Sequence, residues 1–117
     1  MRGASLGVLL VGSADPVRLR AWYAGAFGVC PDEDGVLDFG GIQLVIDRRD
    51  VALRSVEPGR MIITFAVDDI ATTESRLIDH EATWIREVES TPLGRIGTLV
   101  DPDGNYVQVM QPAREHP

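Results

Sequence analysis

The chain repeats one plan twice, and this repeat constrains its fold more than any other feature of the 117 residues. In each half an apolar segment, starting near Leu6 and Met61, leads to an aspartate placed to cap a helix, Asp15 or Asp69. Later in each half an apolar run follows a glycine turn, as GGIQLVID and then as GNYVQVMQ. Such a repeat predicts two similar units that bury their apolar faces together.

The boundaries of the two halves follow from the polar stretch between them. Residues 48–59 contain three arginines, two acidic residues and a Pro-Gly pair, which is typical of a linker. We therefore predict one domain over residues 1–117, with modules at about residues 5–47 and 60–112.

The first half begins with a continuous apolar run, Leu6 to Val11, which predicts a strand covered on both faces. Pro16 follows the capping aspartate at the first helical position, where its missing N–H costs nothing, and Gly28 ends the helix. A Gly40-Gly41 pair between two apolar runs predicts a hairpin. One apolar stripe of the helix is expected to pack on the sheet: Leu19, Trp22, Tyr23, Ala26 and Phe27.

The second half contains a helix, followed by a strand whose side chains are expected to alternate between two faces. From Thr83 to Glu89 the alternation predicts a half-exposed strand with Trp84, Arg86 and Val88 on one face. His80 lies where the helix should end, which favours a cation at the surface.

The end of the chain, Thr91 to Pro112, predicts a second hairpin. Pro102 has the fixed φ that suits the first central position of a turn, and Gly104 takes a positive φ at little cost. Asp101 can accept hydrogen bonds from the turn backbone.

This closing segment resembles the end of a vicinal oxygen chelate domain, the superfamily of glyoxalases, bleomycin resistance proteins and extradiol dioxygenases. The resemblance is carried by a TP-x-G-R segment, by a strand that ends in DPDGN and by a last strand that ends in QP. It implies an α+β fold in which two βαβββ modules form a curved, mostly antiparallel eight-stranded sheet around a cleft, with the helices outside. It also implies a homodimer. The first half is shorter than the second between cap and glycine turn, so it is expected to have clipped strands or a reduced hairpin.

The resemblance also indicates where a metal would be held. Metal-bearing members use inward-facing His, Glu or Gln on the first and last strand of each module, and these positions correspond here to Val8, Leu44, Ile62 and Gln108. Three of the four are aliphatic, and one neutral amide does not hold a divalent ion. We therefore predict no metal and no cofactor.

Without an ion, the same positions predict a largely apolar small-molecule site. Gln108 could orient a ligand through its amide, or it could be satisfied within the sheet. Arg95 could pair with an anionic group, although a surface ion pair is the commoner role. Trp84 and Tyr106 offer rings for stacking, but Trp on a strand more often belongs to a core or an interface. The candidate ligand-binding residues are Val8, Leu44, Ile62, Trp84, Arg95, Tyr106 and Gln108.

The composition excludes other partners. A formal net charge of -7 argues against nucleic acid, since phosphate binding needs a basic face. The apolar run from Leu6 to Val11 is too short to span a bilayer, so no membrane partner is expected. Cys30 is alone, which rules out an internal disulfide and favours a reducing, cytoplasmic location.

The leading interpretation is a metal-free protein that sequesters a small apolar or aromatic molecule, as bleomycin resistance proteins do. A second interpretation is a metal-independent lyase or isomerase acting on a small carbonyl compound, for which Asp38 or Glu87 would have to serve as the acid or base. A partner-binding protein with a vestigial cleft and a metal site at other positions are the remaining alternatives. The shortage of histidines makes the metal site the last of these alternatives.

Overall fold

The computed structural model describes residues 3–113, and these residues form seven strands and two helices. The chain divides into two compact units, the first ending at Leu53 and the second beginning at Arg54. This boundary falls inside the stretch interpreted as a linker. The predicted α+β class is confirmed, with seven strands in the described residues in place of the eight expected.

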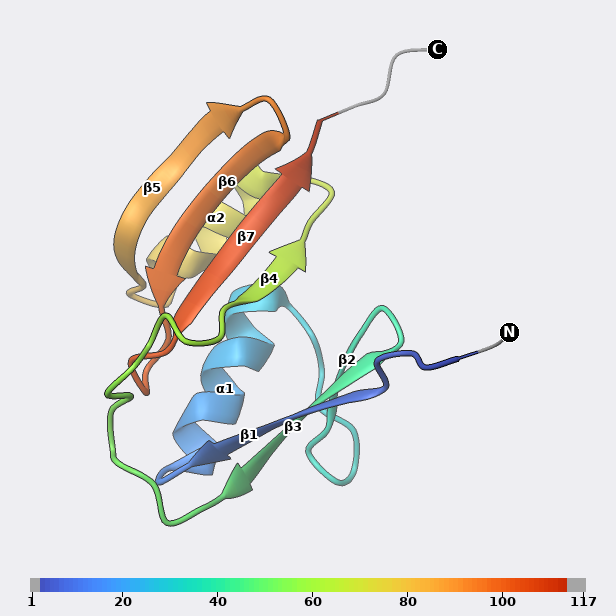
Figure 1. Ribbon diagram of the computed structural model, residues 1–117, viewed down its shortest axis with the longest axis vertical. Helices are drawn as coiled ribbons and strands as arrows, with labels where there is room; N and C mark the ends of the chain where they lie inside the picture. Colours follow the sequence, from blue (N-terminus) through green and yellow to red (C-terminus); the bar gives the residue numbers. More distant parts are fainter. Residues whose placement is uncertain (1–2, 114–117) are drawn as a thin grey trace. The chain divides into compact units, whose positions relative to one another are not determined.

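The first unit contains a three-stranded sheet and one helix (Figure 1). Strand β1 (Val8–Ser13) runs parallel to β3 (Ile42–Arg48), and β2 (Leu37–Phe39) pairs antiparallel with β3 on its other side. The predicted hairpin with its Gly40-Gly41 turn joins β2 to β3, and both glycines have positive φ, as a tight two-residue turn requires. This module therefore has one strand fewer than the second, which explains its shorter sequence.

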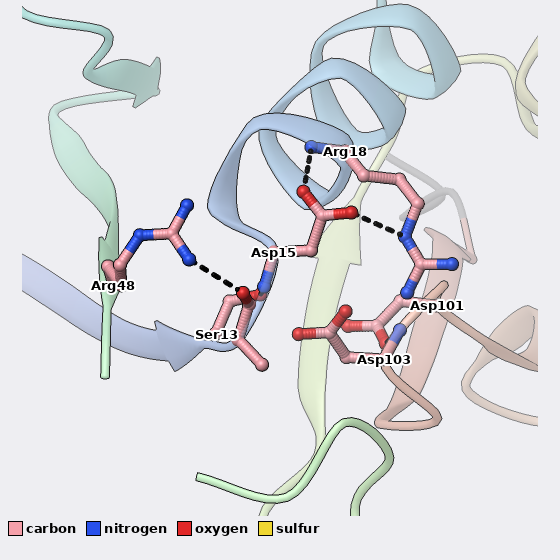
Figure 2. A network of polar contacts seen from close by, with 7 residues as sticks. Ser13, Asp15, Arg18, Arg48, Asp101 and Asp103 are labelled. Atoms are coloured by element: carbon pink, nitrogen blue, oxygen red, sulfur yellow. Dashed lines mark hydrogen bonds and ion pairs between the residues drawn. The ribbon is translucent and has the colours of Figure 1, made fainter. Parts of the chain in front are cut away.

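Helix α1 (Pro16–Phe27) begins and ends where the sequence predicts. The Asp15 carboxylate accepts a hydrogen bond from the backbone N–H of Arg18 at 3.3 Å, and its other oxygen lies 3.7 Å from the Arg18 Nε (Figure 2). Gly28 ends the helix in the left-handed region with φ 66°, which costs a glycine nothing. The predicted stripe is buried at Leu19 and Tyr23, and Tyr23 stacks on Phe27 with ring centroids 6.3 Å apart.

The expectation that the first strand is covered on both faces is wrong. Leu44 of β3 is buried on the face that α1 covers, whereas Val8 and Leu10 of β1 remain 53% and 55% exposed. The strand also begins two residues later than predicted, at Val8. A continuous apolar run gives no alternation to indicate an open face, and for this reason the sequence suggested two-sided burial.

The second unit contains a four-stranded sheet in the order β4-β7-β6-β5. Strands β4 (Ile63–Ala66) and β7 (Tyr106–Pro112) are parallel, and β6 (Gly94–Val100) is antiparallel to both β7 and β5 (Thr83–Thr91). The closing hairpin is confirmed. The Asp101 Oδ1 atom accepts hydrogen bonds from the backbone N–H groups of Asp103 and Asn105, both at 2.9 Å, and Gly104 has φ 82°.

Helix α2 (Ile70–Asp79) lies behind β6 and β7 in Figure 1 and covers one face of this sheet. Asp69 is its N-cap and His80 its C-cap, as predicted. The backbone N–H of Ile70 donates to the Gln111 side-chain oxygen at 2.9 Å, which ties the start of the helix to the last strand.

The pKa of Asp69 is held below its ordinary value of 3.8. The largest cause is the hydrogen bond that the Thr72 hydroxyl donates to its Oδ2 atom at 2.8 Å. Desolvation opposes this effect, while the backbone N–H groups of Thr72 and Ala71 and the charge of Arg95 reinforce it. A lowered folded-state pKa favours the folded state above the unfolded value, and this contribution is lost as pH falls through the folded pKa.

The substitution Thr72→Val should raise the pKa of Asp69 toward its ordinary value, because the hydroxyl that stabilises the carboxylate is removed. It should also reduce stability at neutral pH and leave it unchanged in acid below the folded pKa of Asp69. NMR titration of the Asp69 carboxyl carbon measures the first effect. Ser75→Ala, on the same helix, is the control. An Asp69 pKa that Thr72→Val leaves unchanged would refute the assignment.

Candidate ligand-binding face

The side of the second sheet away from α2 carries a row of polar side chains. We call this side the open face. The helix covers the other side, where Leu99, Val107 and Val109 are buried to 1% exposure or less. Because residues paired across strands share a face, the strand register places four side chains in one line across the open face. They are Thr64 of β4, Gln108 of β7, Thr98 of β6 and Arg86 of β5.

Hydrogen bonds join three members of this row. The Thr64 hydroxyl donates to the Gln108 Oε1 atom at 3.0 Å, and the Gln108 Nε2 atom donates to the Thr98 hydroxyl at 3.3 Å. Each bond uses only part of what the Gln108 amide can form, since an amide has two N–H donors and two acceptor sites. The row therefore orients Gln108 and still leaves a donor and an acceptor for a bound molecule.

Apolar side chains lie on both sides of the polar row. Tyr106 and Met110 are two residues from Gln108 along β7, so all three share the open face, and Ile96 of β6 pairs with Met110. The backbone of Gly59, in the loop before β4, lies beside the Tyr106 ring. A few polar groups within an apolar surface are the usual composition of a small-molecule site.

Two irregularities in β5 determine which of its side chains reach the open face. The register shifts between Trp84 and Arg86 and again between Arg86 and Glu89. Trp84 pairs with Leu99, on the helix side, whereas Arg86 pairs with Thr98, on the open face. A β-bulge has this effect because the extra residue turns the following side chain over.

The prediction that Trp84, Arg86 and Val88 share a face is therefore wrong for Arg86 and right for the other two. A Cβ atom added to Gly97 would lie 2.9 Å from both the Trp84 ring and Val88, so those two side chains pack together on the helix side. Strict alternation over Thr83 to Glu89 assumed an unbroken strand, and the register shifts lie within that stretch.

The sequence-predicted ligand residues of the second unit separate into two groups. Tyr106 and Gln108 lie together on the open face. Trp84 and Arg95 lie on the other side, where Arg95 pairs with Gln111 and its charge acts on Asp69. Ile62 precedes β4 and is 43% exposed, and the residue that contacts Gln108 from β4 is Thr64.

In the first unit, Val8 and Leu44 lie on opposite faces of the sheet. Leu44 is 2% exposed and faces α1, so its placement on an inward, helix-free face is wrong by one residue. Val8 pairs with Gln43 on the uncovered side. Leu44 was matched to Gln108 by counting forward from the glycine of each hairpin turn. This count fails because two residues join β2 to β3, whereas five join β6 to β7.

Counting from the helix caps gives a better correspondence between the modules. Leu10 lies five residues before Asp15, and Thr64 lies five before Asp69. Their partners in the register are Val45 and Gln108. The polar pair of the second module thus corresponds to an aliphatic pair in the first.

These residues do not fit a divalent metal ion. Leu10 and Val45 have no donor atoms, and Thr64 and Gln108 supply only a hydroxyl and an amide. Metal sites of this kind need carboxylate or imidazole ligands. Within residues 3–113, no group of three or more His, Cys, Asp and Glu side chains is placed to hold a metal.

The two carboxylates considered for acid–base catalysis are not members of the polar row. Asp38 pairs with Gln43 in the first unit and is exposed, and Glu87 is an exposed residue of β5. Sequence reasoning missed Thr64, Thr98 and the orientation of Arg86. The count back from the caps led to Ile62, two residues before Thr64, and no signal in a single sequence indicates the shifts in β5.

No helix in the described part of the chain is long and apolar enough to cross a membrane.

Comparison with known proteins identifies the fold. The protein-family model that describes the glyoxalase-like domain matches residues 8–110 of this chain. A glyoxalase/bleomycin resistance protein/dioxygenase family enzyme from Burkholderia phytofirmans PsJN is 18% identical, with a TM-score of 0.76, over 94% of this chain and 100% of that one. TnmS3, an antibiotic binding protein from Streptomyces sp. CB03234, is 22% identical, with a TM-score of 0.70, over 97% and 99% of the two chains. A glyoxalase-related enzyme from Fulvimarina pelagi is 20% identical, with a TM-score of 0.73, over 92% and 87%.

A search of curated proteins gave no match. The family model covers most of the sequence and agrees with the two-module plan and with the solved structures of similar fold. The chain therefore belongs to the glyoxalase-like proteins of the vicinal oxygen chelate superfamily.

Proposed function

We propose that this protein binds a small, largely apolar or aromatic molecule without a metal ion and acts by sequestering it in the cytoplasm. The observation that carries the proposal is the open face of the second unit, where Gln108 is held by Thr64 and Thr98 between apolar side chains. This arrangement supplies contact area together with an oriented amide, and it lacks the charged ligands that metal-dependent chemistry needs.

Two further observations support binding over catalysis. A protein of similar fold, TnmS3, is an antibiotic binding protein, and its 22% identity relates the folds while leaving the ligand of this chain open. The polar row itself contains no carboxylate, imidazole or thiol that could transfer a proton at neutral pH. Binding is thus the activity that the residues of the polar row can perform unaided.

Calorimetric titration with a panel of aromatic antibiotics and metabolites, in buffer that contains EDTA, tests this proposal. We expect at least one compound to bind with a dissociation constant below about 1 mM, the level at which binding contributes roughly 4 kcal/mol. Thr98→Val and Gln108→Leu should each weaken that binding up to about tenfold, because a hydrogen bond contributes roughly 1 kcal/mol.

Thr72→Val, on α2 and outside the open face, is the matched control and should bind as the wild type does. Circular dichroism establishes that each variant is folded. If no compound saturates the protein, sequestration is wrong and the partner-binding alternative gains support. If binding appears only when EDTA is replaced by a divalent metal, metal independence is wrong.

We also propose that the protein is a homodimer, as its family resemblance implies. The exposed Val8 and Leu10 side chains support this, because they form an apolar surface on the uncovered side of the first sheet. Sedimentation equilibrium should give twice the mass of the chain. A monomer at every concentration tested would contradict the proposal.

A further inference from the structure

We propose that the open face selects aromatic molecules that carry a carboxylate group, and that Arg86 is the residue that recognises this group. The inference rests on the proposed function, since it assigns a ligand class to the same face. It is carried by the position of one arginine at the end of the polar row, by the irregularities that place it there and by the weakness of its present ion pair.

Arg86 reaches the open face through a local departure from strand geometry. A regular strand would have put it on the same side as Trp84, which faces the helix. The register shift between the two instead pairs Arg86 with Thr98, next to Gln108 in the row. Bulges interrupt the ladder of hydrogen bonds and redirect a side chain, and they are over-represented both at sheet edges, where β5 lies, and next to active sites.

The second shift turns Glu89 to the same face, where it pairs with Ile96. Arg86 Nη1 and Glu89 Oε1 are 3.6 Å apart, with 73% and 54% of the two side chains exposed. An exposed pair at this distance contributes little to stability. A ligand carboxylate that forms two parallel hydrogen bonds with the guanidinium can therefore replace Glu89.

No other strand residue of the second unit offers the same charge to the open face. Strands β4 to β7 contain two arginines and no lysine or histidine, and Arg95 lies on the helix side near Asp69. The chain as a whole carries a net charge of -7, which repels anions. Among the strand residues of the second unit, Arg86 is thus the cation that can pair with an anionic ligand on this face.

The row also determines the shape of a suitable ligand. Gln108 and Thr98 lie between Arg86 and the β4 edge of the sheet, with Met110 and Tyr106 on either side along β7. A flat ring can cover these side chains while its carboxylate reaches Arg86 at the β5 edge. The free N–H of Gln108 then faces the ring or a polar substituent on it.

A matched pair of probes, 2-naphthoate and 2-naphthamide, tests the inference because the two differ in charge and hardly in size. Calorimetry should show naphthoate binding about five- to tenfold more tightly than naphthamide to the wild type, the range for one exposed charge-assisted hydrogen-bonding contact. Arg86→Gln should remove this preference, because it should weaken naphthoate binding much more than naphthamide binding. Glu89→Gln should tighten naphthoate binding, because the competing carboxylate is gone.

Arg86→Lys and Arg76→Gln complete the series. Lysine keeps the charge without the two-pronged geometry, so Arg86→Lys should retain only part of the preference. Arg76→Gln removes an exposed arginine of α2 and should change neither affinity.

The outcomes separate this inference from the proposed function. Equal binding of both probes by the wild type, or a preference that persists in Arg86→Gln, overturns the role of Arg86 and leaves small-molecule binding intact. If neither naphthalene binds while another aromatic compound does, selection of aromatic carboxylates is wrong. If no aromatic compound binds at all, the proposed function fails and this inference fails with it.

Discussion

Each sheet of this protein is covered by one helix on one side, and this one-sided cover determines which side chains are available for binding. Side chains alternate along a strand, so every residue of a covered sheet belongs either to the core or to the uncovered side. A displacement of one residue moves a candidate from one to the other. Leu44 and Gln43 illustrate the consequence, because the first is buried under α1 and its neighbour is exposed.

In the second module the same rule separates the buried core from the open face. Val107 and Val109 of β7 pack beneath α2, and Gln108 between them points to the open face, where two threonines hold its amide. The corresponding positions of the first module, Leu10 and Val45, are aliphatic. The superfamily fold is thus retained while the positions that could hold an ion have hydroxyl, amide and hydrocarbon groups, which favours a neutral or singly charged organic ligand over a metal.

Much of the fold could be predicted from local signals. Asp15 and Asp69 mark the starts of the helices because their carboxylates accept hydrogen bonds from the first turn. Gly28 marks the end of α1 because a glycine adopts the left-handed conformation without strain. The two hairpins follow in the same way from Gly40-Gly41 and from the turn after Asp101. These features depend on residues within a few positions of one another, so a single sequence contains them.

The site was harder to predict because it depends on the register between strands. The bulges in β5 leave no mark in the sequence, yet they put Trp84 and Arg86 on opposite faces. Hairpin turns of unequal length displaced the count that led to Leu44, and the count back from the caps led to Ile62, two residues before Thr64. Gln108 and Tyr106 share one face because β7 is regular and follows its turn directly.

The most direct test of the central claim follows the side-chain amide of Gln108 by NMR while an aromatic ligand is added in the presence of EDTA. If the open face binds its ligand through this amide and without an ion, the Gln108 side-chain resonances will shift in a saturable way and the Gln43 resonances will not. Resonances that stay fixed while the ligand binds elsewhere, or that move only after a divalent metal is supplied, would contradict the account.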